Sequence, residues 1–108
     1  MMELKENNCV PLSEGTDAMK KEEIERYKKQ LLTEWLVTKA EKLKKTFLFE
    51  NYKRAMAFVQ EVALIAEKEN HHPDICIYHT TVEIELTTHD VGGLSINDFI
   101  IAAKIEDL

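Results

Sequence analysis

The chain has 108 residues, of which 44% are hydrophobic and 31% charged, a composition typical of one folded globular domain and unlike that of disordered or fibrous proteins. Two cysteines, Cys9 and Cys76, are too few for a disulfide framework and favour a reducing compartment. No apolar run reaches the roughly 18 residues that a membrane span needs, and the first residues lack the apolar segment of a secretory signal. We therefore expect a cytoplasmic protein without a membrane partner.

The charge is divided unevenly along the chain. The formal charge is +2 over residues 1–54 and −8 over residues 55–108, and the net charge is −6. An acidic surface repels the phosphate backbone, so direct binding of nucleic acid is not expected.

The first part of the chain shows no hydrophobic periodicity. We expect residues 1–16 to form a flexible N-terminal extension before a single domain over residues 17–108. Thr16 or Asp17 is a predicted cap for a first helix, which should run to about Leu32.

The remaining elements follow from apolar spacing, caps and turn residues. In chain order they are strands at 35–38 and 46–49 with a Lys/Glu-rich turn between them, a helix at 52–69, strands at 75–78 and 82–87, and a helix from Ser95 to about Glu106. The order α-β-β-α-β-β-α contains no connection that requires parallel strands. The sequence therefore predicts an α+β fold, with a four-stranded antiparallel sheet and three helices packed on one face.

The predicted helix at 52–69 has a wide apolar face. Phe58 and Ile65 lie beside its core stripe and widen that stripe to about half of the circumference. Such a face is typical either of a well-buried helix or of a helix that also lines a subunit interface. We expect a homodimer or homotetramer with this helix at an interface, because burial of each of these two side chains is worth roughly 1.5–3 kcal/mol.

Three histidines, His71, His72 and His89, lie in loops or at element ends next to carboxylates. Imidazole suits proton transfer near neutral pH, and loops on a rigid sheet commonly carry functional sites. The alternative is that these are polar surface residues held by backbone hydrogen bonds. A zinc site is a weaker hypothesis, because no His-x-His or His-x-x-x-His pair presents two rings on one face.

The single tryptophan, Trp35, is open to two interpretations. It is either a core residue of the first hairpin or the border of a pocket for a flat heteroaromatic ring. The chain has no Gly-x-Ser-x-Gly or Gly-x-Gly-x-x-Gly segment, so a serine nucleophile and a nucleotide cradle of those types are not predicted.

Several segments together form a specific pattern. They are Glu67-Lys68-Glu69-Asn70-His71-His72-Pro73-Asp74-Ile75, Leu86-Thr87-Thr88-His89-Asp90 and Gly92-Gly93-Leu94-Ser95, followed by Asp98. The pattern resembles the pterin-4a-carbinolamine dehydratase family over about residues 17–108. The resemblance implies a four-stranded antiparallel sheet with helices on one side, a dimer or tetramer, no metal and no bound cofactor.

The resemblance also implies an activity and a site. The activity is that of a lyase, which eliminates water from 4a-hydroxytetrahydrobiopterin to give quinonoid dihydrobiopterin and so recycles the pterin of aromatic amino-acid hydroxylases. Acid–base work is assigned to His71, His72 and His89, with Glu67 orienting or charging a histidine. The residues implied to contact the reduced pterin are Asn70, His71, His72, Thr87, Thr88, His89, Asp90 and Trp35. The alternative is a non-enzymatic role on the same fold, as a dimerisation or assembly partner or a transcriptional coactivator.

Overall fold

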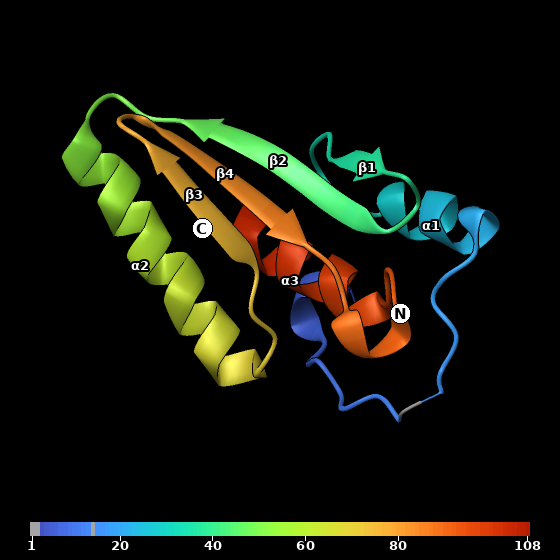
Figure 1. Cartoon of the computed structure of the whole chain (residues 1–108). Coiled ribbons are helices and arrows are strands. Elements are labelled where there is room, and N and C mark those ends of the chain that lie inside the picture. Colours follow the sequence, from blue (N-terminus) through green and yellow to red (C-terminus); the bar gives the residue numbers. More distant parts are fainter. Residues whose placement is uncertain (1–2, 14) are drawn as a thin grey trace.

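Figure 1 shows the computed structural model, which describes residues 3–13 and 15–108. The strands are β1 (Leu36–Thr38), β2 (Lys42–Leu48), β3 (Asp74–Tyr78) and β4 (Thr81–Leu86), and they form one antiparallel sheet in the order β1-β2-β4-β3. The helices are α1 (Lys21–Lys28), α2 (Tyr52–Glu69) and α3 (Ile96–Glu106), with short 3-10 helices η1 (Leu4–Glu6) and η2 (His89–Val91). The predicted α+β fold and its order of elements are confirmed.

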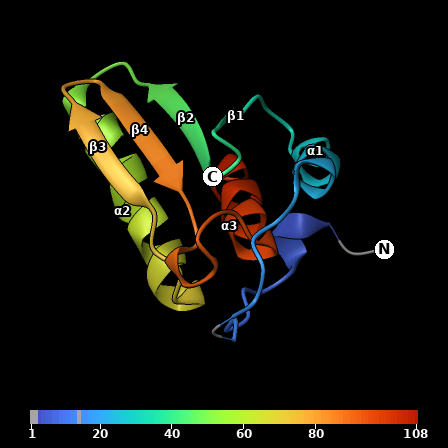
Figure 2. The same ribbon diagram turned by 45° about the vertical axis from the view of Figure 1, so that its right-hand side comes forward.

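One face of the sheet carries the hydrophobic core. Val82, Ile84 and Leu86 alternate along β4 and are fully buried, and the strand register puts Leu43 and Phe47 of β2 on the same face. Helices α2 and α3 cover the sheet on this side (Figures 1 and 2). In the described part of the chain, no helix is long and apolar enough to cross a bilayer.

Helix α1 begins later than predicted. Its N-cap is Lys20, whose backbone N–H donates a hydrogen bond to the Glu23 side chain (3.3 Å). This contact satisfies one of the free donors at the helix start. The prediction that Thr16 or Asp17 caps the helix is therefore wrong.

The end of α1 is fixed by a carboxylate from the far end of the chain. Glu106 accepts hydrogen bonds from the backbone N–H groups of Leu32 (2.9 Å) and Thr33 (2.8 Å), and from the indole N–H of Trp35 (3.0 Å). The backbone groups of Leu32 and Thr33 are thus used outside a helix, so the helix ends at Lys28 and not near Leu32.

Strand β2 is longer than the predicted strand at 46–49. On the uncovered face of the sheet, two lysines of β2 contact glutamates of β4: Lys42 with Glu85 (3.0 Å) and Lys44 with Glu83 (3.4 Å). Opposite charges on neighbouring strands stabilise the pairing. The segment expected to be a Lys/Glu-rich turn is therefore mostly strand.

Helix α2 has the predicted bounds, and Asn51 caps it by accepting a backbone N–H of the first turn (2.9 Å). Phe58 and Ile65 are half-buried and pack against the core of the same chain. The Phe58 ring lies 4.7 Å from Phe47 and 5.0 Å from Phe49 between centroids. The two side chains that widen the helix face thus have partners inside one chain.

Part of the N-terminal segment packs along α3 (Figure 2). Leu4 is only 5% exposed and belongs to the core. Lys104 of α3 donates a hydrogen bond to the Lys5 carbonyl (2.9 Å), and the Lys5 amine contacts Asp107 (3.0 Å). We expected residues 1–16 to be a flexible extension. The structure instead holds described residues of this segment against α3, although residues 1, 2 and 14 lie outside the described part.

Candidate functional site

Antiparallel pairing brings the two loops that carry the candidate histidines to one end of the sheet. Asp74 at the start of β3 pairs with Glu85 near the end of β4. The loop before β3 (residues 70–73) and the connection after β4 (residues 87–95) therefore lie next to each other, and α3 begins from the second of them.

The backbone at the end of α2 sets the shape of the first loop. Asn70 adopts the left-handed conformation (φ 53°, ψ 41°), which asparagine tolerates better than most residues. The backbone N–H groups of Asn70 and His71 both reach the Ala66 carbonyl, the latter at 3.1 Å. The helix ends abruptly, and the chain places the His71 ring toward α3.

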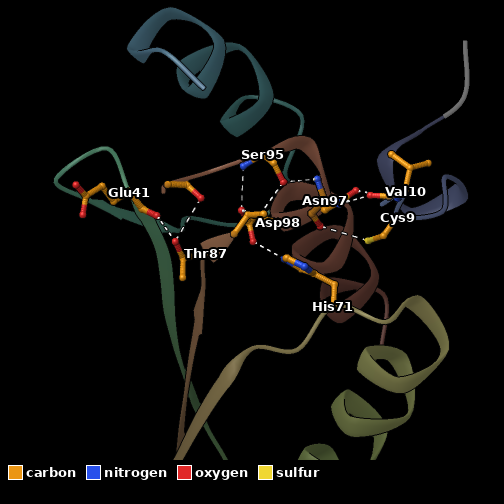
Figure 3. A network of polar contacts seen from close by, with 10 residues as sticks. Cys9, Val10, Glu41, His71, Thr87, Ser95, Asn97 and Asp98 are labelled. Atoms are coloured by element: carbon orange, nitrogen blue, oxygen red, sulfur yellow. Dashed lines mark hydrogen bonds and ion pairs between the residues drawn. The ribbon is translucent and has the colours of Figure 1, made fainter. Parts of the chain in front are cut away.

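A fully buried carboxylate orients His71 (Figure 3). Asp98 Oδ1 lies 2.6 Å from His71 Nε2, while Oδ2 accepts hydrogen bonds from the Thr88 hydroxyl (2.7 Å) and the Ser95 N–H (3.0 Å). Each oxygen thus has its own partners. Because Nε2 contacts Asp98, Nδ1 is the ring nitrogen that this contact leaves for another partner.

The neighbouring imidazole has a carboxylate of its own. His72 Nε2 lies 2.6 Å from Glu67 Oε2, one turn back on α2. This pair is exposed, with 56% of the His72 side chain and 78% of the Glu67 side chain accessible. Solvent screens such a pair strongly, so its contact supplies orientation more than binding energy.

The threonines of the second loop use their hydroxyls within the protein. Thr87 donates to a backbone carbonyl in the β1–β2 turn (2.7 Å), and Thr88 is bound to the buried carboxylate described above. The backbone of Thr88 also pairs with Gly93, with an N–H to carbonyl distance of 2.8 Å. These bonds close a loop in which His89 and Asp90 begin η2 with exposed side chains.

A pocket of about 370 Å³ lies where the two loops meet α3, a volume within the range of small-molecule sites. Among the predicted site residues, Asn70, His71, Thr88 and Asp90 line it. Another part of its wall comes from residues 9–12 of the N-terminal segment, which we call the strap.

The structure does not gather every predicted site residue into this pocket. Its lining within the described chain does not include Glu67, His72, Thr87 or His89, which come from the same two loops and the last turn of α2. Trp35 lies elsewhere: it is fully buried, and its indole N–H is bound to Glu106. A larger hollow of about 520 Å³, between η1, α3 and the end of α1, contains none of the predicted residues.

Hydrogen bonds hold the strap against the pocket (Figure 3). The Cys9 N–H donates to Glu69 (2.7 Å), and the Val10 N–H donates to the Asn97 side-chain oxygen (3.1 Å), whose amide group donates back to the Val10 carbonyl (2.7 Å). Burial, followed by the charges of nearby carboxylates, raises the pKa of the Cys9 thiol to about 12. The thiol is therefore protonated near neutral pH, and it donates to the Asn97 carbonyl (3.6 Å).

Two parts of this arrangement were not predicted from the sequence. In the sequence, Asp98 is only the last residue of the recognised pattern; in the structure it also completes the capping box with Ser95, the N-cap of α3. Its contact with His71 joins residues 27 positions apart, and no local pattern signals such a contact. The contact of the strap with the pocket was not predicted either, because this segment has no hydrophobic periodicity.

Within the described ranges, no group of three or more His, Cys, Asp or Glu side chains is arranged to hold a metal ion.

Comparison with known proteins identifies the family. Residues 17–108 match the family model described as pterin 4 alpha carbinolamine dehydratase. A protein of Alkaliphilus metalliredigens, named "Putative pterin-4-alpha-carbinolamine dehydratase", is 42% identical over 106 residues, which cover 98% of this chain and 96% of the relative. A protein of Rubrobacter xylanophilus with the same name is 43% identical over 108 residues and covers 100% of both chains. The chain belongs to the pterin 4 alpha carbinolamine dehydratase family.

Two solved structures share the fold. A transcriptional coactivator/pterin dehydratase from Brucella melitensis superimposes with a TM-score of 0.78 at 26% identity, covering 84% of this chain and 97% of the other. A pterin dehydratase-like protein described as a RuBisCO assembly factor in the alpha-carboxysome has a TM-score of 0.60 at 26% identity, with 70% and 89% of the two chains covered. The family and the names of its members support a pterin carbinolamine dehydratase activity, and one protein of this fold is described as an assembly factor.

Proposed function

We propose that the protein eliminates water from 4a-hydroxytetrahydrobiopterin to give quinonoid dihydrobiopterin, and so recycles the pterin of aromatic amino-acid hydroxylases. The observation that carries the proposal is a pair of consecutive imidazoles, each 2.6 Å from a carboxylate of its own: His71 with Asp98, and His72 with Glu67. An elimination needs an acid and a base at one small ring, and two separately oriented imidazoles supply both roles.

The chemistry of the proposed reaction matches these groups. The C4a–O bond breaks while an acid protonates the hydroxyl, which leaves as water. The proton on N5 passes to a base, and the electron pair of the N–H bond forms the C4a=N5 double bond. The step involves no net oxidation. A positioned acid or base of this kind is worth about 10²–10⁴ in rate.

Each residue of the site has a role in the proposal. His71, His72 and His89 perform the proton transfers, with Asp98 and Glu67 orienting the first two rings. The pterin is contacted by Asn70 and Asp90 from opposite loops, while Thr87 and Thr88 shape the second loop. Trp35 has no role in pterin contact in this proposal, because it is fully buried and bound to Glu106.

A second candidate function is a non-enzymatic role as an assembly partner or coactivator. The structural similarity to a RuBisCO assembly factor favours it. A docking surface has no need for two consecutive imidazoles held by carboxylates, so their presence argues for the enzyme. If this protein lacked dehydratase activity but acted as an assembly partner or coactivator, the second candidate would be favoured.

The proposal includes a homodimer or homotetramer in the cytoplasm, with α2 at the interface. The outer surface of α2 exposes Tyr52 (53%) and Leu64 (64%), and covering such side chains in each subunit is favourable. The two free cysteines agree with a reducing compartment. Light scattering should give a dimer or tetramer mass, whereas a monomer mass at micromolar concentration contradicts the assembly.

The decisive experiment is a dehydration assay with a matched histidine control. Freshly generated 4a-hydroxytetrahydrobiopterin loses ultraviolet absorbance as it dehydrates, and the protein should accelerate that loss. His71→Ala and His72→Ala should each slow turnover by about two orders of magnitude or more. His79 serves as the control, because it lies in the β3–β4 turn with a positive φ of 56° that asparagine also tolerates. His79→Asn should therefore keep full activity, and equal turnover in all four proteins removes the histidine pair from the mechanism.

A further inference from the structure

We infer that the strap, residues 9–12, is a wall of the pterin pocket that binds the substrate ring. The strap lies outside residues 17–108, the part of the chain that matches the family model. The inference rests on the proposed function and adds to it a substrate-binding element from the N-terminal segment.

The chemistry of the pocket walls supports this assignment. One side is lined by the polar residues His71, Thr88 and Asp90, and the strap contributes the apolar residues Val10 and Leu12. Val10 is 53% exposed although it borders a pocket, so an occupant would bury apolar surface there. A reduced pterin has a reacting edge with a hydroxyl and N–H groups, and ring faces that are far less polar. Such a ring fits with its reacting edge toward the imidazole and a face against the strap.

The strap is held by buried groups that are specific to its backbone. The Asn97 side chain binds both the N–H and the carbonyl of Val10, as a neighbouring strand would, and Asn97 is only 5% exposed. The Glu69 side chain, 4% exposed, accepts the Cys9 N–H. Buried hydrogen bonds of this kind are costly to leave unmade, so the strap has a defined position.

The strap and the catalytic imidazole are positioned by the same turn of α3. Asn97 binds Val10, and the next residue, Asp98, binds His71. The spacing between the apolar wall and the His71 ring is therefore fixed by adjacent helical residues. The strap contributes no group to proton transfer, since its one titratable side chain, the Cys9 thiol, stays protonated near neutral pH.

Two variants test the strap in the full-length protein. Val10→Ala/Leu12→Ala shortens the apolar wall and keeps the backbone hydrogen bonds, while Asn97→Ala releases the strap. Lys5→Ala is the matched control, because it removes the contact with Asp107 (3.0 Å) at η1, away from the pocket lining. For each protein we would measure kcat and KM for dehydration, the Kd of 7,8-dihydrobiopterin by calorimetry, and the thermal midpoint.

Alkylation of the two cysteines reports directly on whether the strap is seated. Cys9 lies in the strap, and Cys76 lies on the uncovered sheet face, paired in register with Glu83. Asn97→Ala should speed the reaction of Cys9 with iodoacetamide at least tenfold relative to Cys76, because release of the strap removes the burial that keeps the thiol protonated. In the unchanged protein, 7,8-dihydrobiopterin should slow the labelling of Cys9 and leave that of Cys76 the same.

The kinetic outcomes distinguish failure of the strap assignment from failure of the proposed function. We expect both strap variants to raise KM and the Kd of dihydrobiopterin about tenfold with kcat within about twofold, and Lys5→Ala to change none of them. Unchanged KM and Kd in both strap variants of an active enzyme overturn the strap assignment and leave the proposed function standing. Absence of both dehydration and dihydrobiopterin binding in the unchanged protein overturns the proposed function, and the strap assignment with it.

Discussion

Replacing Asp98 with asparagine should lower kcat for dehydration by about 10- to 150-fold while the protein stays folded. The substitution keeps the shape of the side chain and changes only its charge and one hydrogen-bonding atom. An amide oxygen in the place of Oδ2 still accepts the Thr88 hydroxyl and the Ser95 N–H, which lie at 2.7 and 3.0 Å. An amide NH₂ in the place of Oδ1 faces His71 Nε2, now 2.6 Å from a carboxylate oxygen.

The magnitude follows from that one contact. A hydrogen bond to a charged group contributes roughly 1.5–3 kcal/mol, and about 1.4 kcal/mol corresponds to a factor of ten in rate. Losing the contact lets the His71 ring rotate or take the other tautomer, so the fraction of correctly oriented imidazole falls by that factor. The drop should appear in kcat, because Asp98 is fully buried and positions His71 without touching the pterin itself.

A double-mutant cycle tests this reasoning in the absorbance assay. If Asp98 acts through His71, then Asp98→Asn should cost almost nothing further in a His71→Gln background. Urea unfolding of each variant checks that the fold is intact. Additive losses in the double variant, or full kcat in Asp98→Asn, would refute the idea that this carboxylate orients the imidazole.

Three further predictions concern neighbouring groups. In the absorbance assay, Glu67→Gln should lower kcat by less than Asp98→Asn does, because the contact between Glu67 and His72 is exposed and screened by solvent. A larger loss of kcat in Glu67→Gln than in Asp98→Asn contradicts this ranking. Activity should survive exhaustive dialysis against a chelator, and a loss that zinc restores would reverse the expectation that no metal takes part. The unfolded Cys9 thiol ionises near its ordinary pKa of 9.0 and the folded one only near about 12, so its contribution to stability is complete below pH 9 and is lost as the pH rises above it. By urea unfolding, the free energy of unfolding should fall less between pH 8 and pH 10 for Cys9→Ala than for the unchanged protein. Equal falls would contradict the burial of the Cys9 thiol.

Local patterns predicted the elements whose ends are determined locally. Helix α2 begins at a cap provided by Asn51 and ends at a left-handed Asn70, and α3 begins at the capping box of Ser95 and Asp98. Apolar spacing and caps are sufficient for such helices. The end of α1 depends instead on Glu106, which is more than 70 residues away in sequence, and no local signal announces that contact.

The site divides in the same way. Glu67, His71 and His72 belong to one short segment and His89 to a second segment of the same pattern, so the pattern identified them together. Asp98 reaches His71 only because antiparallel pairing brings the start of β3 beside the end of β4. The contact between Val10 and Asn97 spans 87 positions, and it appears only when the N-terminal segment is packed along α3. Contacts between residues far apart in sequence therefore bring Asp98 and the strap to the site, and local patterns do not predict them.

Nitrogen NMR of protein labelled with ¹⁵N in its histidine rings tests most directly whether a pterin binds at the paired imidazoles. Addition of 7,8-dihydrobiopterin should shift the ring signals of His71 and His72 and leave those of His79, at the other end of the sheet, unchanged. Saturable binding of the pterin with unchanged His71 and His72 signals would contradict this prediction.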